Sequence, residues 1–165
     1  TFDPAHTFVH FEVLHFGTST LRGRFGPLDG TVTLDRTAGR GQVGLRIATA
    51  AVSSGLAVLD KRLRDPELLS SESHPEAFFV AEQFSFDGVQ LREVRGEITL
   101  RGIGRPLSLR ALRFGCKPHP QHGREWCGGD FEAELRRSDF GMTYLLPLVA
   151  DRVRLLIQVE AIREP

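Results

Sequence analysis

The stretch GLAVLDKRLRDPELLSSESHPEAFF, residues 55–79, is the only part of the chain long enough and suitably patterned for a helix. Its leucines recur near helical spacing, and the charged residues between them supply a polar side. Pro66 is expected to end or kink the first turns because proline lacks the amide hydrogen that a helix needs. The sequence therefore predicts one short helical segment, over about residues 56–70.

Most of the remaining chain alternates apolar and polar residues, which is the period of a half-buried β-strand. Residues 131–136 and 153–161 are the cleanest examples. Residues 22–34 predict one bent strand with Gly26 and Pro27 at the bend, and residues 115–129 predict a long loop. Asp87-Gly88 predicts a hairpin turn. Residues 77–86 are apolar in both phases, so alternation does not assign their inward face.

These segments give about eight strands, with no internal repeat and no alternation of strands with helices. The fold class is therefore all-β: an eight-stranded antiparallel barrel forming a single domain over residues 1–165, with one end covered by the short helical lid. The lumen of such a barrel either fills with its own side chains or holds one small ligand. An elongated apolar ligand suits a tube of this kind.

Composition excludes two classes of partner. The 165 residues are 41% hydrophobic, and 21 basic residues balance 21 acidic ones, so no overall field attracts nucleic acid. No apolar run approaches the roughly 18 to 20 residues of a membrane-spanning helix. We expect neither nucleic-acid binding nor a membrane span.

Six motifs occur in an order that is typical of one family. They are DPAHTFVHFEVLHFG (3–17), GRF (23–25), DKRLR (60–64), HPEAFF (74–79), GEITLRGIGRP (96–106) and RSDFGM (137–142). Through them the chain resembles, over nearly its whole length, the YceI family of lipocalin-like isoprenoid-binding proteins. Gly104 departs from the pattern, because the family usually has threonine there.

The resemblance implies an eight-stranded antiparallel lipocalin-like barrel that holds a long isoprenoid chain in its lumen. It implies no catalysis and no cofactor, and a periplasmic or secreted location after removal of a signal peptide. It also implies that Phe79, and not Phe78, points inward. Whether two chains associate as a homodimer is left open.

The candidate ligand-binding residues come from several distant segments. The expected barrel wall is Val13, Phe25, Val32, Leu45, Phe79, Ile98, Phe131 and Ile157. The expected lumen-facing side of the lid is Leu59, Leu63 and Leu68. Three polar residues, His15, Arg24 and Arg64, are candidates for contact with the head group, and their alternative is a structural or exposed role. Phe140, Met142 and Tyr144 either plug the barrel end or form part of the ligand wall.

Two cysteines flank the loop KPHPQHGREW, residues 117–126. A disulfide between Cys116 and Cys127 is the preferred interpretation for an exported protein. One alternative is a zinc site made of these cysteines with His119 and His122, but its spacing matches no common zinc finger. The other alternative is a pair of free thiols. We predict no metal.

Ser138, Asp139 and His74 supply the residue types of a hydrolase triad, yet the chain has no G-x-S-x-G elbow. The prediction is a non-enzymatic protein that binds, stores or transports a long isoprenoid lipid of the polyprenyl phosphate or prenyl quinone type. The rival is a secreted stress-response or structural module whose barrel is filled by its own side chains.

Overall fold

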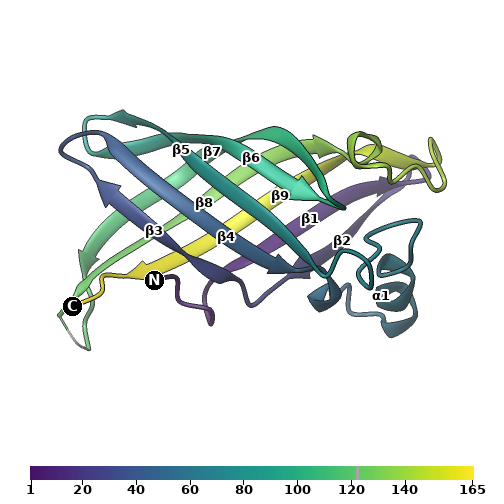
Figure 1. The fold of residues 1–165 in the computed structure, drawn as a ribbon, viewed down its shortest axis with the longest axis horizontal. Coiled ribbons are helices and arrows are strands. Elements are labelled where there is room, and N and C mark those ends of the chain that lie inside the picture. The colour runs from purple at the N-terminus through teal and green to yellow at the C-terminus, as the bar shows by residue number, and fades with distance from the viewer. Residues whose placement is uncertain (122) are drawn as a thin grey trace.

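The computed structural model describes residues 1–121 and 123–165 of the chain. Within them the chain is mostly strand, with one α-helix and two 3-10 helices (Figure 1). The strands are β1 (Phe8–His15), β2 (Ser19–Phe25), β3 (Asp29–Asp35), β4 (Arg40–Ala48), β5 (Glu76–Asp87), β6 (Gln90–Leu100), β7 (Ile103–Pro118), β8 (Glu125–Arg136) and β9 (Val149–Ile162). The helices are η1 (Thr49–Ala51), α1 (Ala57–Leu63) and η2 (Arg137–Phe140).

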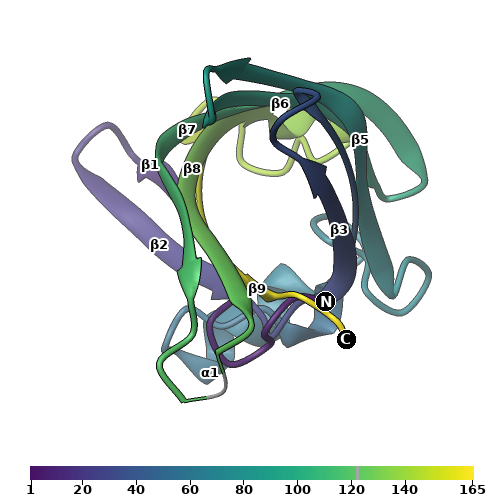
Figure 2. The same cartoon turned by 90° about the vertical axis from the view of Figure 1, so that its left-hand side faces the viewer.

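The strands form one antiparallel sheet in the order β2-β1-β9-β8-β7-β6-β5-β4-β3. Viewed along its length, the sheet curls around a central space (Figure 2). The curled sheet leaves a gap between its two edges. The amino-terminal segment closes one end of this gap, because Phe2 bridges Ala161 of β9 and its amide donates to the Gly30 carbonyl of β3 (3.3 Å). At the other end Arg24 of β2 forms a β-bridge with Ser53. The prediction of an antiparallel barrel-like sheet with one helix is confirmed.

The sheet has nine strands, whereas the sequence suggested about eight. The extra strand arises where one bent strand was expected, because the chain divides at Gly26-Pro27 into β2 and β3. These two consecutive strands lie at opposite edges of the sheet: β2 pairs only with β1, and β3 only with β4. Proline has no amide hydrogen for a strand ladder, so Pro27 marks the point at which pairing changes partner.

The hairpin formed by β7 and β8 replaces the long loop that was expected over residues 115–129. Strand pairing continues to Pro118 opposite Glu125, and Cys116 lies directly opposite Cys127. These cysteines form a disulfide, which confirms the preferred interpretation. Gly115, Gly128 and Gly129 weaken the apolar–polar alternation there, which is why the pattern indicated a loop.

The sheet buries one face of each strand and exposes the other. In β5 the side chain of Phe79 is 3% exposed and that of Phe78 is 41% exposed, so Phe79 points inward as the resemblance implied. The Asp87-Gly88 turn joins β5 to β6 as expected. Inward-facing side chains from all parts of the sheet form one apolar core.

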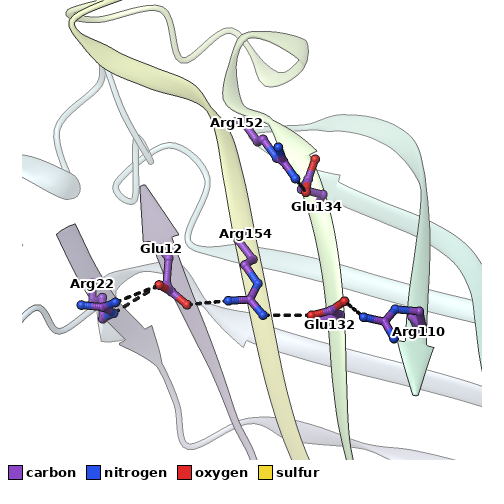
Figure 3. Close-up of polar contacts among 7 residues, drawn as sticks. All are labelled: Glu12, Arg22, Arg110, Glu132, Glu134, Arg152 and Arg154. Carbon is purple, nitrogen blue, oxygen red and sulfur yellow. Dashed lines mark hydrogen bonds and ion pairs between the residues drawn. The ribbon is translucent and has the colours of Figure 1, made fainter. Parts of the chain in front are cut away.

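On the outer face a row of charges crosses five neighbouring strands, β2, β1, β9, β8 and β7 (Figure 3). Glu12 accepts from Arg22 (3.2 Å) and Arg154 (3.2 Å), and Arg154 also reaches Glu132 (3.0 Å). Arg110 pairs with the other oxygen of Glu132. The row connects the edge strand β2 to the middle of the sheet.

The lid differs in length from its prediction. Helix α1 spans only seven residues and ends before Pro66, as that proline required. The chain then folds back, so that the Leu69 amide donates to the Leu63 carbonyl (2.9 Å) and the Ser70 amide to the Asp65 carbonyl (2.9 Å). The predicted helix over residues 56–70 is therefore one short helix followed by turns. Among the described helices none is long and apolar enough to cross a membrane.

Candidate functional site: an apolar lumen beneath the lid

The interior of the sheet contains a cavity of about 180 Å³ on the side of the lid. Strands β1, β2, β4, β5, β6, β7, β8 and β9 contribute to its wall, and Leu63, Leu68 and Leu69 cover it from the lid. Of the 23 residues that line it, only Thr49 and Arg137 have polar side chains. The cavity is therefore a site for hydrocarbon.

A second apolar cavity, of about 70 Å³, lies farther along the lumen. Its wall includes Phe2, Val32 and Phe131, and the sulfur-bearing Cys127. Both cavities are lined by the same four large side chains, which stand between them. These are Leu45, Phe79, Leu109 and Ile157. Movement of these side chains would join the two cavities into one longer tube.

The two polar side chains of the larger cavity already have partners. Thr49 Oγ1 donates to the carbonyl of His74 (2.8 Å). Arg137 is only 4% exposed, and its guanidinium donates to four backbone carbonyls, two in the β8–β9 loop and two at the start of β9. Nη1 reaches Met142 (2.9 Å) and Tyr144 (2.7 Å), Nη2 reaches Val149 (2.7 Å), and Nε reaches Ala150 (2.9 Å).

Burial lowers the pKa of Arg137 from its usual value, and the carboxylate of Asp151 opposes that effect. Burial also disfavours the ionised form of Asp151, but hydrogen bonds from the amide (2.8 Å) and hydroxyl (2.7 Å) of Ser138 outweigh it and lower the pKa of Asp151. Arg137 thus carries a buried charge whose hydrogen bonds fix the course of the loop.

Besides the packing of Leu63 and Leu69 on the core, two arginine side chains hold the lid. Arg101, in the turn between β6 and β7, donates to the carbonyls of Pro66 (2.7 Å), Leu68 and Phe140 (2.9 Å). It therefore ties the lid to η2. The guanidinium of Arg62 lies 4.1 Å from the ring centroid of Tyr144 and adds a cation–π contact between α1 and the β8–β9 loop.

The structure brings many of the predicted ligand residues to the lumen. Those that line the larger cavity are Val13, Phe25, Leu45, Leu63, Leu68, Phe79, Ile98, Met142 and Ile157. Val32 and Phe131 line the smaller one. They come from eight strands, the lid and the loop after η2, yet their side chains meet in one tube.

The other predicted residues lie outside both cavity walls. Leu59 is half-buried, so the lid turns Leu63 and Leu68 inward but not Leu59. Arg24 is exposed, with its guanidinium 4.7 Å from the centroid of the Phe8 ring. His15 packs against the ring of Phe16, with 4.5 Å between centroids.

Arg64 is half-buried at the end of α1, and its charge helps to lower the pKa of Asp60, after the larger effect of hydrogen bonds from Ser54. Phe140 is 1% exposed, and belongs to the core. Tyr144 points outward beneath Arg62. Of the three apolar residues in this segment, only Met142 therefore contributes to the cavity wall.

Sequence reasoning missed Arg137 as part of the cavity wall. Its motif, RSDFGM, was recognised, but the residue type alone does not show whether an arginine is buried or exposed. Other missed wall residues, such as Leu107 and Leu155, were recognisable from alternation within β7 and β9. Thr49 had no sequence signal.

The alternative chemistries do not find a site among the described residues. The disulfide removes both cysteine thiolates from any zinc site, and His122 lies outside the described residues. The Ser138 hydroxyl donates to Asp151, not to a histidine. The group of Asp3, His6 and Glu160, of which only His6 is exposed, has ligand types for a cation, but their contacts are those of a surface ion pair.

The fold and the site define a barrel-like β-protein with an apolar internal cavity closed by a short lid. Residues 1–161 match the family of YceI-like domains. The protein YceI of Escherichia coli O157:H7 is 32% identical over 160 residues, covering 96% of this chain and 83% of the relative. The chain belongs to the YceI family.

Solved structures share the fold at lower identity. A mutant of the Campylobacter jejuni YceI protein superposes with a TM-score of 0.79 at 21% identity, over 92% of this chain and 90% of that one. A polyisoprenoid-binding domain from Saccharophagus degradans, implicated in plant cell wall breakdown, gives a TM-score of 0.68 at 17% identity, over 99% and 100%. Burkholderia cenocepacia BcnA gives a TM-score of 0.75 at 16% identity, over 96% of this chain and 99% of that one.

Proposed function

We propose that this protein binds the hydrocarbon chain of an isoprenoid lipid in its lumen, without catalysis, for storage or transport. The observation that carries the proposal is the wall of the 180 Å³ cavity, whose only polar side chains, Thr49 and Arg137, are hydrogen-bonded to backbone carbonyls. A wall of alkyl and phenyl groups neither transfers protons nor attacks a substrate. Such a wall can only take up apolar surface from water.

The size of the cavity supports an apolar ligand. An apolar cavity of about 150 Å³ in another protein stays dry and binds benzene. Each methylene removed from water contributes about 0.8 kcal/mol, so affinity is expected to rise with chain length until the lumen is full. A chain that outgrows the larger cavity would pass between Phe79 and Ile157 into the smaller one.

Membership of the YceI family supports the class of ligand, since one structure of the same fold is a polyisoprenoid-binding domain. We propose a polyprenyl phosphate or prenyl quinone, with its chain in the lumen. We also propose that the protein acts in the periplasm or outside the cell, a location supported by the disulfide between Cys116 and Cys127. The rival is a secreted module that takes up no lipid, for which the cavities would be packing defects.

One pair of variants tests the proposal. Ala77 is 4% exposed and lines the larger cavity, whereas Ala133 is 8% exposed, faces inward and lines neither cavity. Melting curves of the parent, Ala77→Trp and Ala133→Trp would be recorded with prenyl alcohols of increasing length. We expect Ala77→Trp to shorten the longest alcohol that raises Tm, because its ring fills the space that the chain needs.

Ala133→Trp is the control for overpacking, which is expected to destabilise by about 1 to 3 kcal/mol without changing the length limit. Two results together would contradict the proposal and favour the self-filled barrel. They are that none of the prenyl alcohols raises the Tm of the parent protein, and that solvent extraction of the parent releases no prenyl lipid.

A further inference from the structure

Exposed apolar side chains are concentrated at the lid end of the molecule. Figure 1 shows α1, the β1–β2 turn and the β8–β9 loop at one end, and both chain termini at the other. Of the eleven large apolar residues exposed within the described part of the chain, seven lie in these three lid-end segments or within two residues of them. We call these seven the lid-end rim: Leu14, Phe16, Leu56, Val58, Tyr144, Leu145 and Leu148.

Two segments of the rim are joined directly. The Phe16 amide donates to the Leu148 carbonyl (2.8 Å), and His15 lies opposite Val149 in the β1–β9 pairing. The Val149 amide donates to the Leu145 carbonyl (2.9 Å). The exposed rings and alkyl groups of the β1–β2 turn and the β8–β9 loop are therefore held at fixed positions beside one another.

The backbone at two of these residues is unusual. Phe16 has φ of 51° and Leu145 has φ of 58°, in the left-handed region where glycine is the favoured residue. Phe16 is nevertheless 48% exposed and Leu145 is 41% exposed. Strained backbone of this kind is concentrated at functional sites. Neither side chain packs in the core, so folding alone does not explain why an apolar residue stands at either position.

The rim is continuous with the cavity through one loop. Arg137 binds the carbonyls of Met142 and Tyr144 with the same nitrogen, Nη1. Met142 lines the cavity and Tyr144 lies in the rim, so the two faces of the loop serve the lumen and the surface. A hydrocarbon chain leaving the lumen at this loop would meet apolar side chains outside.

Exposed cations accompany the rim. Arg136, the last residue of β8, lies opposite Arg152 in the β8–β9 pairing, and Arg152 also pairs with Glu134. Lys61 is exposed on α1. Apolar residues that enter the interface, flanked by cations that attract anionic lipids, are the usual features of a surface that binds membranes peripherally.

We propose that the lid-end rim docks on the surface of an anionic lipid bilayer, where the protein exchanges its ligand with the membrane. This inference rests on the proposed lipid-binding function. A bilayer is the proposed occupant of the rim because the same surface combines exposed apolar side chains on strained backbone, flanking cations and continuity with an apolar cavity. A second copy of the chain is the competing occupant.

The test uses Phe16→Gly/Leu145→Gly. Glycine adopts positive φ without strain, so the double variant is expected to fold as stably as the parent while losing two apolar contacts. The matched control is Val89→Ser/Leu112→Ser, which removes two exposed apolar residues outside the lid-end segments. Flotation with vesicles of phosphatidylcholine and phosphatidylglycerol would measure binding, and melting curves would verify folding.

We expect the parent and the control to float with the vesicles, and Phe16→Gly/Leu145→Gly to bind at least about tenfold more weakly, as expected for loss of a phenyl and an isobutyl group from the interface. Added salt should weaken the binding of the parent. Equal flotation of both double variants, or no flotation of the parent, would overturn the proposal. The proposal would also be overturned if the parent and the control were dimers in solution and Phe16→Gly/Leu145→Gly were a monomer, since the rim would then be a contact between copies.

Prenyl alcohol binding, measured by Tm without vesicles, separates this inference from the proposed function. If the parent binds prenyl alcohols but not vesicles, the proposed function stands and the docking surface is refuted. If the parent binds vesicles through the rim but takes up no prenyl alcohol, the docking surface stands and the proposed ligand is refuted. The rim residues changed in the test line neither cavity, so Phe16→Gly/Leu145→Gly should keep the alcohol-induced rise in Tm.

Discussion

The two ends of the barrel are closed by different kinds of interaction. At the end that carries the termini, a disulfide joins β7 to β8, and backbone hydrogen bonds from Phe2 and Asp3 fasten the amino-terminal segment to β3 and β9. At the lid end a seven-residue helix and its turns are held by the side chains of Arg101 and Arg62. The larger cavity lies at the lid end.

This difference indicates which end can open. Opening the end with the termini would break backbone hydrogen bonds of the amino-terminal segment to β3 and β9, whereas displacing the lid would break mainly side-chain contacts. Elements held by few backbone bonds to the rest of a fold open at the lowest free energy. The lid end is therefore the entry that the architecture favours, and the following experiments test this comparison.

The largest effect is expected for Arg137→Met. The substitution removes a buried charge and leaves four backbone carbonyls without their donor, and we expect the free energy of unfolding to fall by about 3 to 5 kcal/mol. Urea denaturation measures it. Arg113→Met is the control, because Arg113 is 82% exposed and pairs with Asp130 at the surface, so its loss should change stability by about 1 kcal/mol or less. Similar losses for both variants would contradict the role of Arg137.

The next effect concerns the end with the termini. Replacing Cys116 and Cys127 by serine removes the cross-link between β7 and β8, and the chain-entropy description gives a loss of about 3 kcal/mol. Urea denaturation of the double variant checks the loss. Binding of short prenyl alcohols should be unchanged, since the larger cavity is at the other end. Loss of short-chain binding together with the cross-link would mean that the two ends are not independent.

Arg101→Met should loosen the lid without unfolding the sheet. Its hydrogen bonds to Pro66, Leu68 and Phe140 disappear, and we expect about 1 to 2 kcal/mol of local stability to be lost. Hydrogen exchange over residues 57–71 should become roughly tenfold faster while exchange in β5 and β6 stays the same. Arg105→Met, near the same turn, is the control, because Arg105 is exposed and its guanidinium donates to the carbonyl of its neighbour Gly104 (3.1 Å), not to the lid. Uniform acceleration across the sheet would show that the lid is part of the core.

The smallest effect is pH-dependent and lies at the end with the termini. The hydrogen bond between His6 Nδ1 and Asp3 Oδ2 (2.7 Å) raises the pKa of His6 and lowers the pKa of Asp3. Because the pKa of His6 is raised, its interaction with Asp3 stabilises the folded state at low pH, and this stabilisation is lost as pH rises through the raised pKa of His6. Because the pKa of Asp3 is lowered, the same interaction is also lost as pH falls through the lowered pKa of Asp3.

The contact is therefore strongest at mildly acidic pH. Exchange of the Asp3 amide, which donates to the Glu160 carbonyl (2.8 Å), should accelerate above the usual pKa range of histidine by more than the intrinsic effect of pH. His6→Asn is expected to remove this extra dependence. The same profile in the parent and in His6→Asn would show that the ion pair does not fasten the segment.

Several features of the protein followed from local sequence. Alternation predicted a barrel-like antiparallel sheet, Pro66 predicted an interruption of the helical segment, and the Asp87-Gly88 turn and the cysteine pair were found as expected. The resemblance predicted that Phe79 would face inward. These features depend on neighbouring residues or on a motif, so they can be read without knowing which segments meet.

The tertiary structure alone decided the remaining features. Gly26-Pro27 indicated a break, but only the partners of β2 and β3 show that the break separates the two edges of the sheet. Leu59 and Leu63 have the same letter, yet only Leu63 lines the cavity. The sequence did not indicate that Arg137 is buried, because its burial depends on backbone carbonyls that the β8–β9 loop and β9 bring to it. Periodicity is a local property, whereas pairing partners, burial and cavities depend on contacts between residues far apart in the chain.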